Sequence, residues 1–147
     1  MTQFSSPWAT ASGAIAGCLL LGACTTPGPV PGANTTALAC MLPSNCVDSW
    51  GTGGLAPLKY LGTPAQALDR IEATLKSFAE AEVVHREPLA LQAIFTTPLG
   101  FRDQVDFQIE PATQRIDFRS RSLLGLFDFG KNQSRMQAFT LRFRATP

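Results

Sequence analysis

Apolar residues in the middle of the chain recur first with the period of a helix. Four of them are spaced by three or four residues: Leu68, Ile71, Leu75 and Phe78. This spacing places them along one helical face. Thr63 and Gln66 fit a capping box, and Pro64 occupies the first helical position, where proline is favoured. The pattern predicts a helix from about Pro64 to Ala81.

The pattern then changes to the alternation of β-strands, in segments around 83–87, 89–96, 105–110 and 115–119. The last two segments predict a hairpin, because facing Phe107 with Phe118 gathers the apolar residues on one side. On the outer side this register places charges of opposite sign across from each other. The predicted cross-strand ion pairs are Asp106 with Arg119 and Glu110 with Arg115.

A second helix is predicted after a loop that contains Gly125 and Gly130. Asn132 is a residue type favoured at a helix N-cap. Beyond it, one apolar face is formed by Met136, Phe139 and Phe143. Together the elements predict an α+β fold, in which an antiparallel sheet of three to four strands packs against two helices in two layers.

The beginning of the chain has a different composition. No Asp, Glu, Lys or Arg precedes Asp48, and an apolar stretch runs from Trp8 to Cys24. Its end, Leu-Gly-Ala-Cys at 21–24, resembles a bacterial lipobox, although no basic residue precedes the stretch as in most signal peptides. We expect a lipoprotein signal peptide at 1–23, an acylated Cys24 on a flexible tether at 24–39, and one domain at 40–147. The alternatives are an ordinary cleaved signal and an uncleaved anchor.

This interpretation places the protein in the bacterial cell envelope, attached to membrane lipid and facing the periplasm. In that oxidising compartment Cys40 and Cys46 favour a small loop disulfide, with free thiols as the alternative. A metal site would need more ligands, and the only histidine, His85, is distant in sequence. We therefore predict no metal and no cofactor.

Three blocks of residues resemble the domain of unknown function 1499 family, a bacterial and plastid group of small exported or membrane-associated domains. The first is Cys40 followed by Asn-Cys-Val-Asp-Ser at 45–49; the second is Phe-Arg-Asp-Gln-Val-Asp-Phe at 101–107. The third begins with Arg-Ser-Arg-Ser at 119–122 and continues through Gly125, Asp128 and Gly130 to Asn132. Several charges typical of the family are replaced, for example by Gln104 and Gln133. The resemblance implies a fold and a compartment, and it supplies no established reaction.

One group of polar residues is a candidate for chemistry. Alternation places Asp103 on the apolar side of its strand, where a carboxylate needs hydrogen-bond donors. The predicted cluster consists of Asp103, Ser120, Ser122, Asp128, Asn132 and Arg135. It could be a pocket for a small anionic ligand, bound by Arg135 or Arg121, or a buried network that joins loop, hairpin and helix. We favour the network, because buried ion pairs with hydrogen bonds commonly serve architecture.

Composition limits the remaining possibilities. The 147 residues are 45% hydrophobic with a net charge of +1, which excludes a disordered chain and gives no global sign of nucleic-acid binding. The basic residues nevertheless concentrate near the end: from Arg115 onward there are seven bases and two acids. With no catalytic residues assigned, we expect a non-catalytic module that binds an envelope protein or a small anionic ligand, or that scaffolds an envelope assembly. The alternatives are an enzyme or enzyme accessory that uses Asp103, Asp128 and Arg135, and a membrane-surface protein that uses its basic C-terminal face.

Overall fold

The sheet extends outward from the hairpin of β5 (Arg102–Glu110) and β6 (Arg115–Ser122). The computed structural model describes residues 38–147. In it Phe107 pairs with Phe118 and Ile109 with Ile116, so the predicted register is confirmed. The turn between the strands is a 3-10 turn at Pro111–Thr113, followed by Gln114 in the left-handed region at φ 47°.

The sheet has six antiparallel strands, more than the three to four predicted. Beyond β5, β4 (Ala90–Thr96) pairs with β3 (Ala81–Glu87), which forms one edge. On the other side of the hairpin, both β1 (Cys46–Asp48) and β2 (Leu58–Lys59) pair with β6. A 3-10 turn at Thr52–Gly54 lies between these two short strands. Strands of three and two residues are too short to show an alternating pattern, and the prediction therefore missed them.

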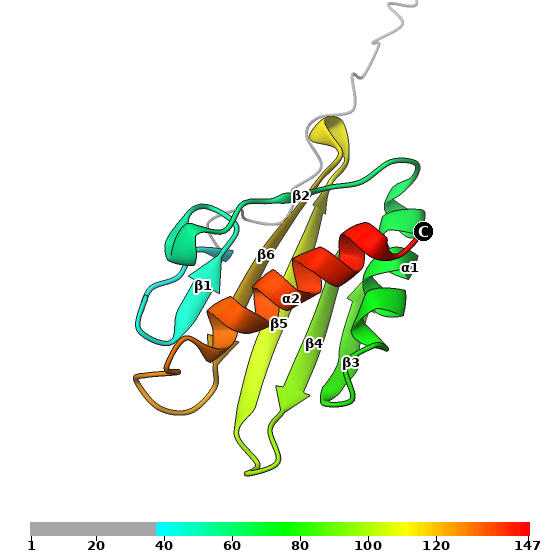
Figure 1. The fold of residues 1–147 in the computed structure, drawn as a ribbon. Helices are drawn as coiled ribbons and strands as arrows, with labels where there is room; N and C mark the ends of the chain where they lie inside the picture. Colours follow the sequence, from blue (N-terminus) through cyan, green and yellow to red (C-terminus); the bar gives the residue numbers. More distant parts are fainter. Residues whose placement is uncertain (1–37) are drawn as a thin grey trace, which may run out of the picture. The chain divides into compact units, whose positions relative to one another are not determined.

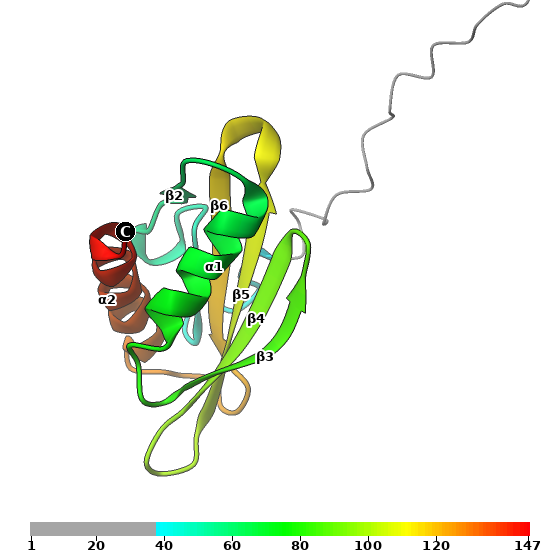
Figure 2. The same cartoon turned by 90° about the vertical axis from the view of Figure 1, so that its right-hand side faces the viewer.

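Both helices cover the same face of the sheet (Figures 1 and 2). Helix α1 (Pro64–Leu75) begins with the predicted capping box, in which the Gln66 N–H donates to the Thr63 hydroxyl and the Gln66 side chain accepts from the Thr63 N–H. Helix α2 (Lys131–Ala145) crosses the sheet in front of β5 and β6 in Figure 1. The two-layer α+β arrangement is therefore the one expected.

Helix α1 is shorter than predicted, because it ends at Leu75 instead of continuing to Ala81. A turn follows, closed by the Ser77 hydroxyl, which donates to the Thr74 carbonyl at 2.6 Å. Phe78 still packs in the core, since a three-residue spacing suits a turn as well as a helix. Ala81 instead begins β3, where it pairs with Phe95.

The core between sheet and helices is rich in aromatic residues. Phe139 of α2 is fully buried, and its ring lies 4.9 Å from Phe107 and 6.0 Å from Phe143. Leu38, near the start of the described residues, is also buried, at 8% exposure. Within residues 38–147, no helix is both long and apolar enough to cross a bilayer.

Candidate functional site

The six residues of the predicted polar cluster meet at one end of the sheet, on the side of the helices. Asp103 lies near the start of β5 and Ser120 and Ser122 near the end of β6, while Asn132 and Arg135 lie on the first turns of α2. The sixth, Asp128, lies in the connection between β6 and α2. Alternation along the two strands directs the first three side chains towards the helix, which explains why distant segments meet here.

The centre of this polar cluster is a buried ion pair. The Nη2 atom of Arg135 lies 2.6 Å from the Oδ2 atom of Asp103, and the side chains of Arg135 and Asp103 are only 3% and 5% exposed, respectively. The guanidinium also lies over the Phe95 ring, 4.7 Å from its centroid. A desolvated charge pair of this kind is stabilised only when both partners and their hydrogen bonds are present.

Asn132 uses the full hydrogen-bonding capacity of its side-chain amide. Its Oδ1 accepts from Ser120 at 2.6 Å and from Arg135 at 2.8 Å. Its Nδ2 donates to the Asn45 carbonyl at 3.0 Å and to Ser122 at 3.2 Å. The predicted role of Asn132 as N-cap is therefore wrong: it lies inside α2, and its side chain connects three segments, namely α2, β6 and the loop before β1.

Asp128 performs the capping that was assigned to Asn132. Its carboxylate accepts from the Gly130 N–H at 3.0 Å and from the Asn132 N–H at 2.8 Å. The residue in the N-cap position, Gly130, has a φ of 76° and no capping side chain. A carboxylate at this end of a helix satisfies open N–H groups and favours the helix dipole.

The buried polar atoms of the cluster have their hydrogen-bond partners within the protein. Among residues 38–147, every fully buried side-chain nitrogen and oxygen atom has a hydrogen-bond partner. Arg121, the alternative anion-binding residue, lies on the other face of the sheet and donates to Gln104 at 3.2 Å. Its side chain is thus remote from Arg135, and the two cannot bind one small anion together.

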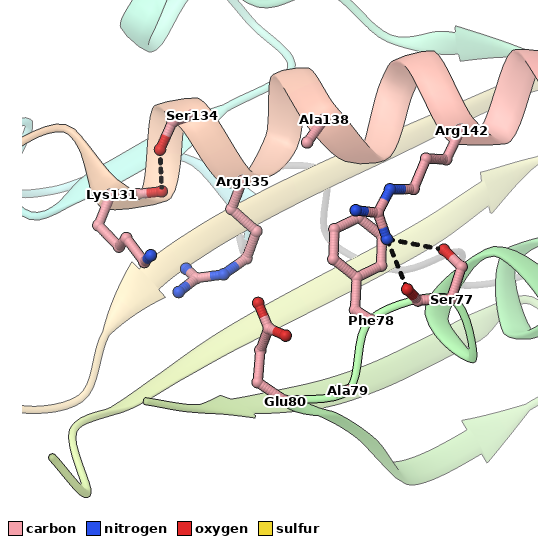
Figure 3. Close-up of a pocket in the computed structure, with 9 residues that line it drawn as sticks. All are labelled: Ser77, Phe78, Ala79, Glu80, Lys131, Ser134, Arg135, Ala138 and Arg142. Atoms are coloured by element: carbon pink, nitrogen blue, oxygen red, sulfur yellow. Dashed lines mark hydrogen bonds between the residues drawn. The ribbon is translucent and has the colours of Figure 1, made fainter. Parts of the chain in front are cut away.

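A shallow hollow lies beside the cluster, between α2 and the turn after α1 (Figure 3). Its volume is about 450 Å³, within the range of small-molecule sites. Arg135, Lys131 and Glu80 border it. Arg142 borders it as well, but donates to the Ser77 carbonyl at 2.6 Å and stacks over a phenylalanine. An anionic ligand in the hollow would compete with protein groups for both arginines.

The cysteines of the described region are joined. Cys40 and Cys46 form the predicted disulfide, with their Cα atoms 5.7 Å apart. The bridge closes the loop directly before β1, the short strand that pairs with β6.

His85 lies on the exposed edge strand and contacts Glu87 at 2.8 Å. In the part of the chain that the structure describes, no group of three or more His, Cys, Asp or Glu residues is arranged to hold a metal.

The family described as protein of unknown function (DUF1499) matches residues 38–143. The chain belongs to the DUF1499 family. A comparison with curated proteins finds no match. The match covers the disulfide loop, the whole sheet and nearly all of α2, so the residues of the polar cluster belong to the DUF1499 domain itself.

The other face of the DUF1499 sheet carries one of the two predicted ion pairs. Arg119 lies 2.7 Å from Asp106, which also accepts from Gln92 and Gln104. The pair of Glu110 with Arg115 is replaced by other contacts, even though the two residues are register partners.

Both partners of that predicted pair have nearer groups. Arg115 binds Asp117 at 2.9 Å, two residues along the same face, while the Glu110 carboxylate accepts from the Ala112 N–H. Asp117 attracts Arg115 because it is itself buried and charged. Cross-strand register alone therefore could not decide which carboxylate the arginine meets.

Asp117 is a buried polar residue that the sequence analysis missed. Alternation placed it on a solvent-facing side, yet it is 1% exposed. It accepts from the Trp50 indole at 3.1 Å and from Ser49 at 3.3 Å, in addition to Arg115. The segment after β1 covers this end of β6, and strand alternation contains no signal for such a cover.

Asp48 is the second missed residue, and it organises the disulfide loop. It is 3% exposed and accepts from the N–H groups of Cys40, Trp50 and Thr52 and from the Thr52 hydroxyl. Burial alone would raise the pKa of this carboxyl, but the four hydrogen bonds together lower the pKa below its ordinary value of 3.8. An acidic residue followed closely by a threonine was the available signal for such a turn.

The lowered pKa of Asp48 predicts a pH dependence of stability. Because the folded state holds the ionised form, the stabilisation is present above the unfolded pKa, near 3.8, and is lost as pH falls through the folded value. We expect Asp48→Asn to lower the free energy of unfolding at pH 7 and to differ less from the parent below about pH 4. Urea unfolding at pH 7 and at a pH below about 4 measures the difference in the free energy of unfolding between variant and parent. The exposed Asp69→Asn is the control, and an equal deficit of Asp48→Asn at both pH values would contradict the prediction.

The predicted lipidation site, Cys24, lies outside the described residues, as does the predicted signal peptide. Most of the predicted tether also lies there, although its last residues, Leu38 and Ala39, belong to the described part.

Proposed function

We propose that this DUF1499 protein is a non-catalytic module of the bacterial cell envelope, anchored to membrane lipid through Cys24, which binds or scaffolds an envelope partner. One observation carries the non-catalytic part of the proposal. In the polar cluster, the strongest candidate for chemistry, both carboxylates, the amide and the guanidinium are hydrogen-bonded to other groups of the protein. A catalytic acid, base or nucleophile needs access to a substrate.

The alternative of an enzyme or accessory using Asp103, Asp128 and Arg135 has weaker support. Asp103 and Arg135 neutralise each other at 2.6 Å, and the Asp128 carboxylate accepts from the N–H of Gly130, the N-cap residue of α2, and from the N–H of Asn132 within it. A substrate would first have to break these bonds. Such groups suit a framework that fixes the loop and helix to the sheet better than a reaction centre.

A membrane surface built from the basic C-terminal residues is also the weaker proposal. Arg142 is stacked on Phe78 at 3.8 Å, and Arg115 is paired with Asp117. Arg135 is buried in the cluster. The excess of bases after position 115 therefore largely serves internal contacts, and it leaves less positive charge for lipid headgroups than the sequence count indicates.

Support for the anchor comes from the Leu-Gly-Ala-Cys sequence at 21–24, together with the disulfide of Cys40 and Cys46, which suits an oxidising compartment. Acyl chains on one cysteine would hold the domain near a membrane without spanning it. The partner would then lie in the envelope, and nucleic acid would be excluded by location.

Labelling with radioactive palmitate tests the anchor. We expect the parent chain to incorporate label and to be shortened by signal cleavage, and Cys24→Ser to lose both the label and the cleavage. Cys18→Ser is the matched control, because Cys18 is the other cysteine of the leader and should change neither. Undiminished labelling of Cys24→Ser would refute lipid attachment at this residue.

A further inference from the structure

Three loops meet at one end of the sheet, which we name the apolar loop end: residues 41–45, 97–101 and 123–130. The Leu123 N–H donates to the Arg102 carbonyl at 3.0 Å, which joins the third loop to the first residue of β5, directly after the second loop. The Asn45 side chain donates to the Gly125 carbonyl at 2.7 Å, which joins the third to the first. Figures 1 and 2 both show the β4–β5 turn and the β6–α2 connection at the lower end of the sheet.

Large apolar side chains gather in these loops and face solvent. Among residues 38–147, fourteen large hydrophobic residues are exposed, and nine of them lie in the apolar loop end. In the third loop, Phe129 is 100% exposed, Leu124 71%, Phe127 68% and Leu126 66%. Scattered exposed residues are ordinary, but a concentration of this kind marks a surface that something covers.

These side chains are held outward by a fixed backbone. The Ser44 hydroxyl donates to the Leu126 carbonyl at 2.5 Å, and the Asp128 N–H donates to the Ser44 carbonyl at 3.2 Å. Phe129 has a φ of 54°, in the left-handed region that a bulky aromatic residue rarely adopts. The Asp128 carboxylate spans this residue by its bonds to Gly130 and Asn132. The backbone at Phe129 is thus strained in a conformation that leaves its aromatic ring exposed to solvent.

Basic residues border the apolar loop end. Arg102 follows the second loop, Arg121 precedes the third, and Lys131 follows the third; all three are exposed. Two acids lie at this margin: Glu80, which is exposed and whose backbone carbonyl accepts from the Thr96 N–H, and Asp128, which is partly buried in the third loop and accepts from N–H groups at the start of α2. The balance of charge is positive, which complements the negative surface of a membrane that contains anionic lipid.

We propose that the apolar loop end inserts its leucine and phenylalanine side chains into the interface of a bilayer with anionic headgroups. Apolar side chains at the acyl boundary with arginine and lysine at the headgroups are the arrangement of interfacial membrane contacts. The side chains extend from the tips of three separate loops. A fluid bilayer accepts such tips without a matching shape, whereas a protein partner must supply a complementary surface.

This inference goes beyond the proposed function, because the loops would contact lipid whether or not Cys24 is acylated. A tether restrains only the distance of the domain from a membrane. Insertion of the loops would also set its orientation, with the sheet end of the β4–β5 turn towards the lipid and β2 away from it.

An environment-sensitive fluorophore on the third loop tests the proposal. A nitrobenzoxadiazole label is attached at Phe127→Cys in the full chain carrying Cys18→Ser and Cys24→Ser; Cys40 and Cys46 are protected as a disulfide. The matched control carries the label at Leu61→Cys, away from the loops, where the parent side chain is 84% exposed against 68% for Phe127. Vesicles of phosphatidylethanolamine with a minor share of phosphatidylglycerol are added, with and without nitroxide-labelled lipid.

We expect the label at 127 to shift to the blue and to be quenched by the nitroxide, and the label at 61 to do neither. Equal changes at both positions, or no change at 127, would overturn the proposal. A shift at 127 that requires higher protein concentration or an envelope extract instead of vesicles would also overturn it, in favour of a second copy or a protein partner. Because acylation is removed in this background, failure here is distinct from failure of the palmitate test.

A variant measures how much the loop contributes. Leu124→Ser with Phe127→Ser and Phe129→Ser should weaken vesicle association on the order of tenfold or more, since three apolar side chains are lost. Leu61→Ser with Val84→Ser and Leu141→Ser is the control, and both triple variants carry the same leader. Melting temperatures should stay near the parent value, because all six side chains are exposed. Equal weakening in the two variants would refute the role of the loop.

Discussion

Asp103→Ala is expected to lower the free energy of unfolding by about 3–5 kcal/mol, because it leaves the Arg135 guanidinium buried without its counter-charge. The Arg135 side chain is only 3% exposed, so water replaces little of the lost interaction. The free energy of unfolding of a small domain is about 5–15 kcal/mol, so this loss would be a large fraction of the stability. Urea unfolding followed by far-ultraviolet circular dichroism measures it.

Two further variants separate the buried pair from the general effect of losing a charge. Asp69→Ala removes a carboxylate that is 69% exposed in its pair with Arg86, and should cost about 1 kcal/mol or less. The double variant Asp103→Leu with Arg135→Met should recover most of the stability, since it removes both charges and keeps apolar volume. If Asp103→Ala instead folded with nearly parental stability, the cluster would not be architectural, and the ligand-pocket hypothesis would gain.

The elements that could be predicted from the sequence are those whose residues also decide the structure. The β5–β6 register follows from burying Phe107 against the helices with Phe118, since a shift of one residue would expose every apolar side chain of the strand. Helix α1 begins where Thr63 and Gln66 cap it, a local signal that tertiary contacts did not alter. The apolar face of α2 could likewise be predicted, because it follows from the spacing of residues within the helix itself.

The remaining features depend on segments that meet only in the fold. Strand β1 is formed because the disulfide loop closes on the edge of β6, and its three residues carry no period of their own. Asp117 is buried because Trp50, far away in sequence, lies against it. Helix α1 ends early because Ala81 pairs across to Phe95. None of these contacts leaves a repeating pattern along the chain.

The polar cluster shows both the strength and the limit of the sequence argument. A carboxylate on the core side of a strand must find donors, and this rule placed Arg135, the partner of Asp103, among four candidate donors without a structure. The rule could not tell which donor went where. A separate argument assigned Asn132 as the helix N-cap, because asparagine near the beginning of an apolar helical pattern is usually a cap, whereas in the structure Asp128 caps the helix.

Asn132→Ala is expected to lower the free energy of unfolding by about 3 kcal/mol, because Ser120, Arg135 and the Asn45 carbonyl each lose a buried hydrogen-bond partner. An N-cap asparagine would cost only about 1 kcal/mol on the same change, and aspartate or serine would replace it with little loss. The two roles therefore predict different results for the conservative variants.

Asn132→Asp is the decisive comparison. As a cap it would be neutral; as the network centre it should destabilise strongly, because an acceptor oxygen would replace the Nδ2 group that donates to the Asn45 carbonyl. Ser134→Ala, in the same helical turn but exposed, controls for changes in helix propensity. Thermal and urea unfolding of the parent and the three variants measure these effects. If Asn132→Asp were as stable as the parent, the residue would act as a cap and not as the network centre. A strong loss would instead mean that the third loop, whose Gly125 carbonyl is held by Asn45, depends on this one side chain for its position.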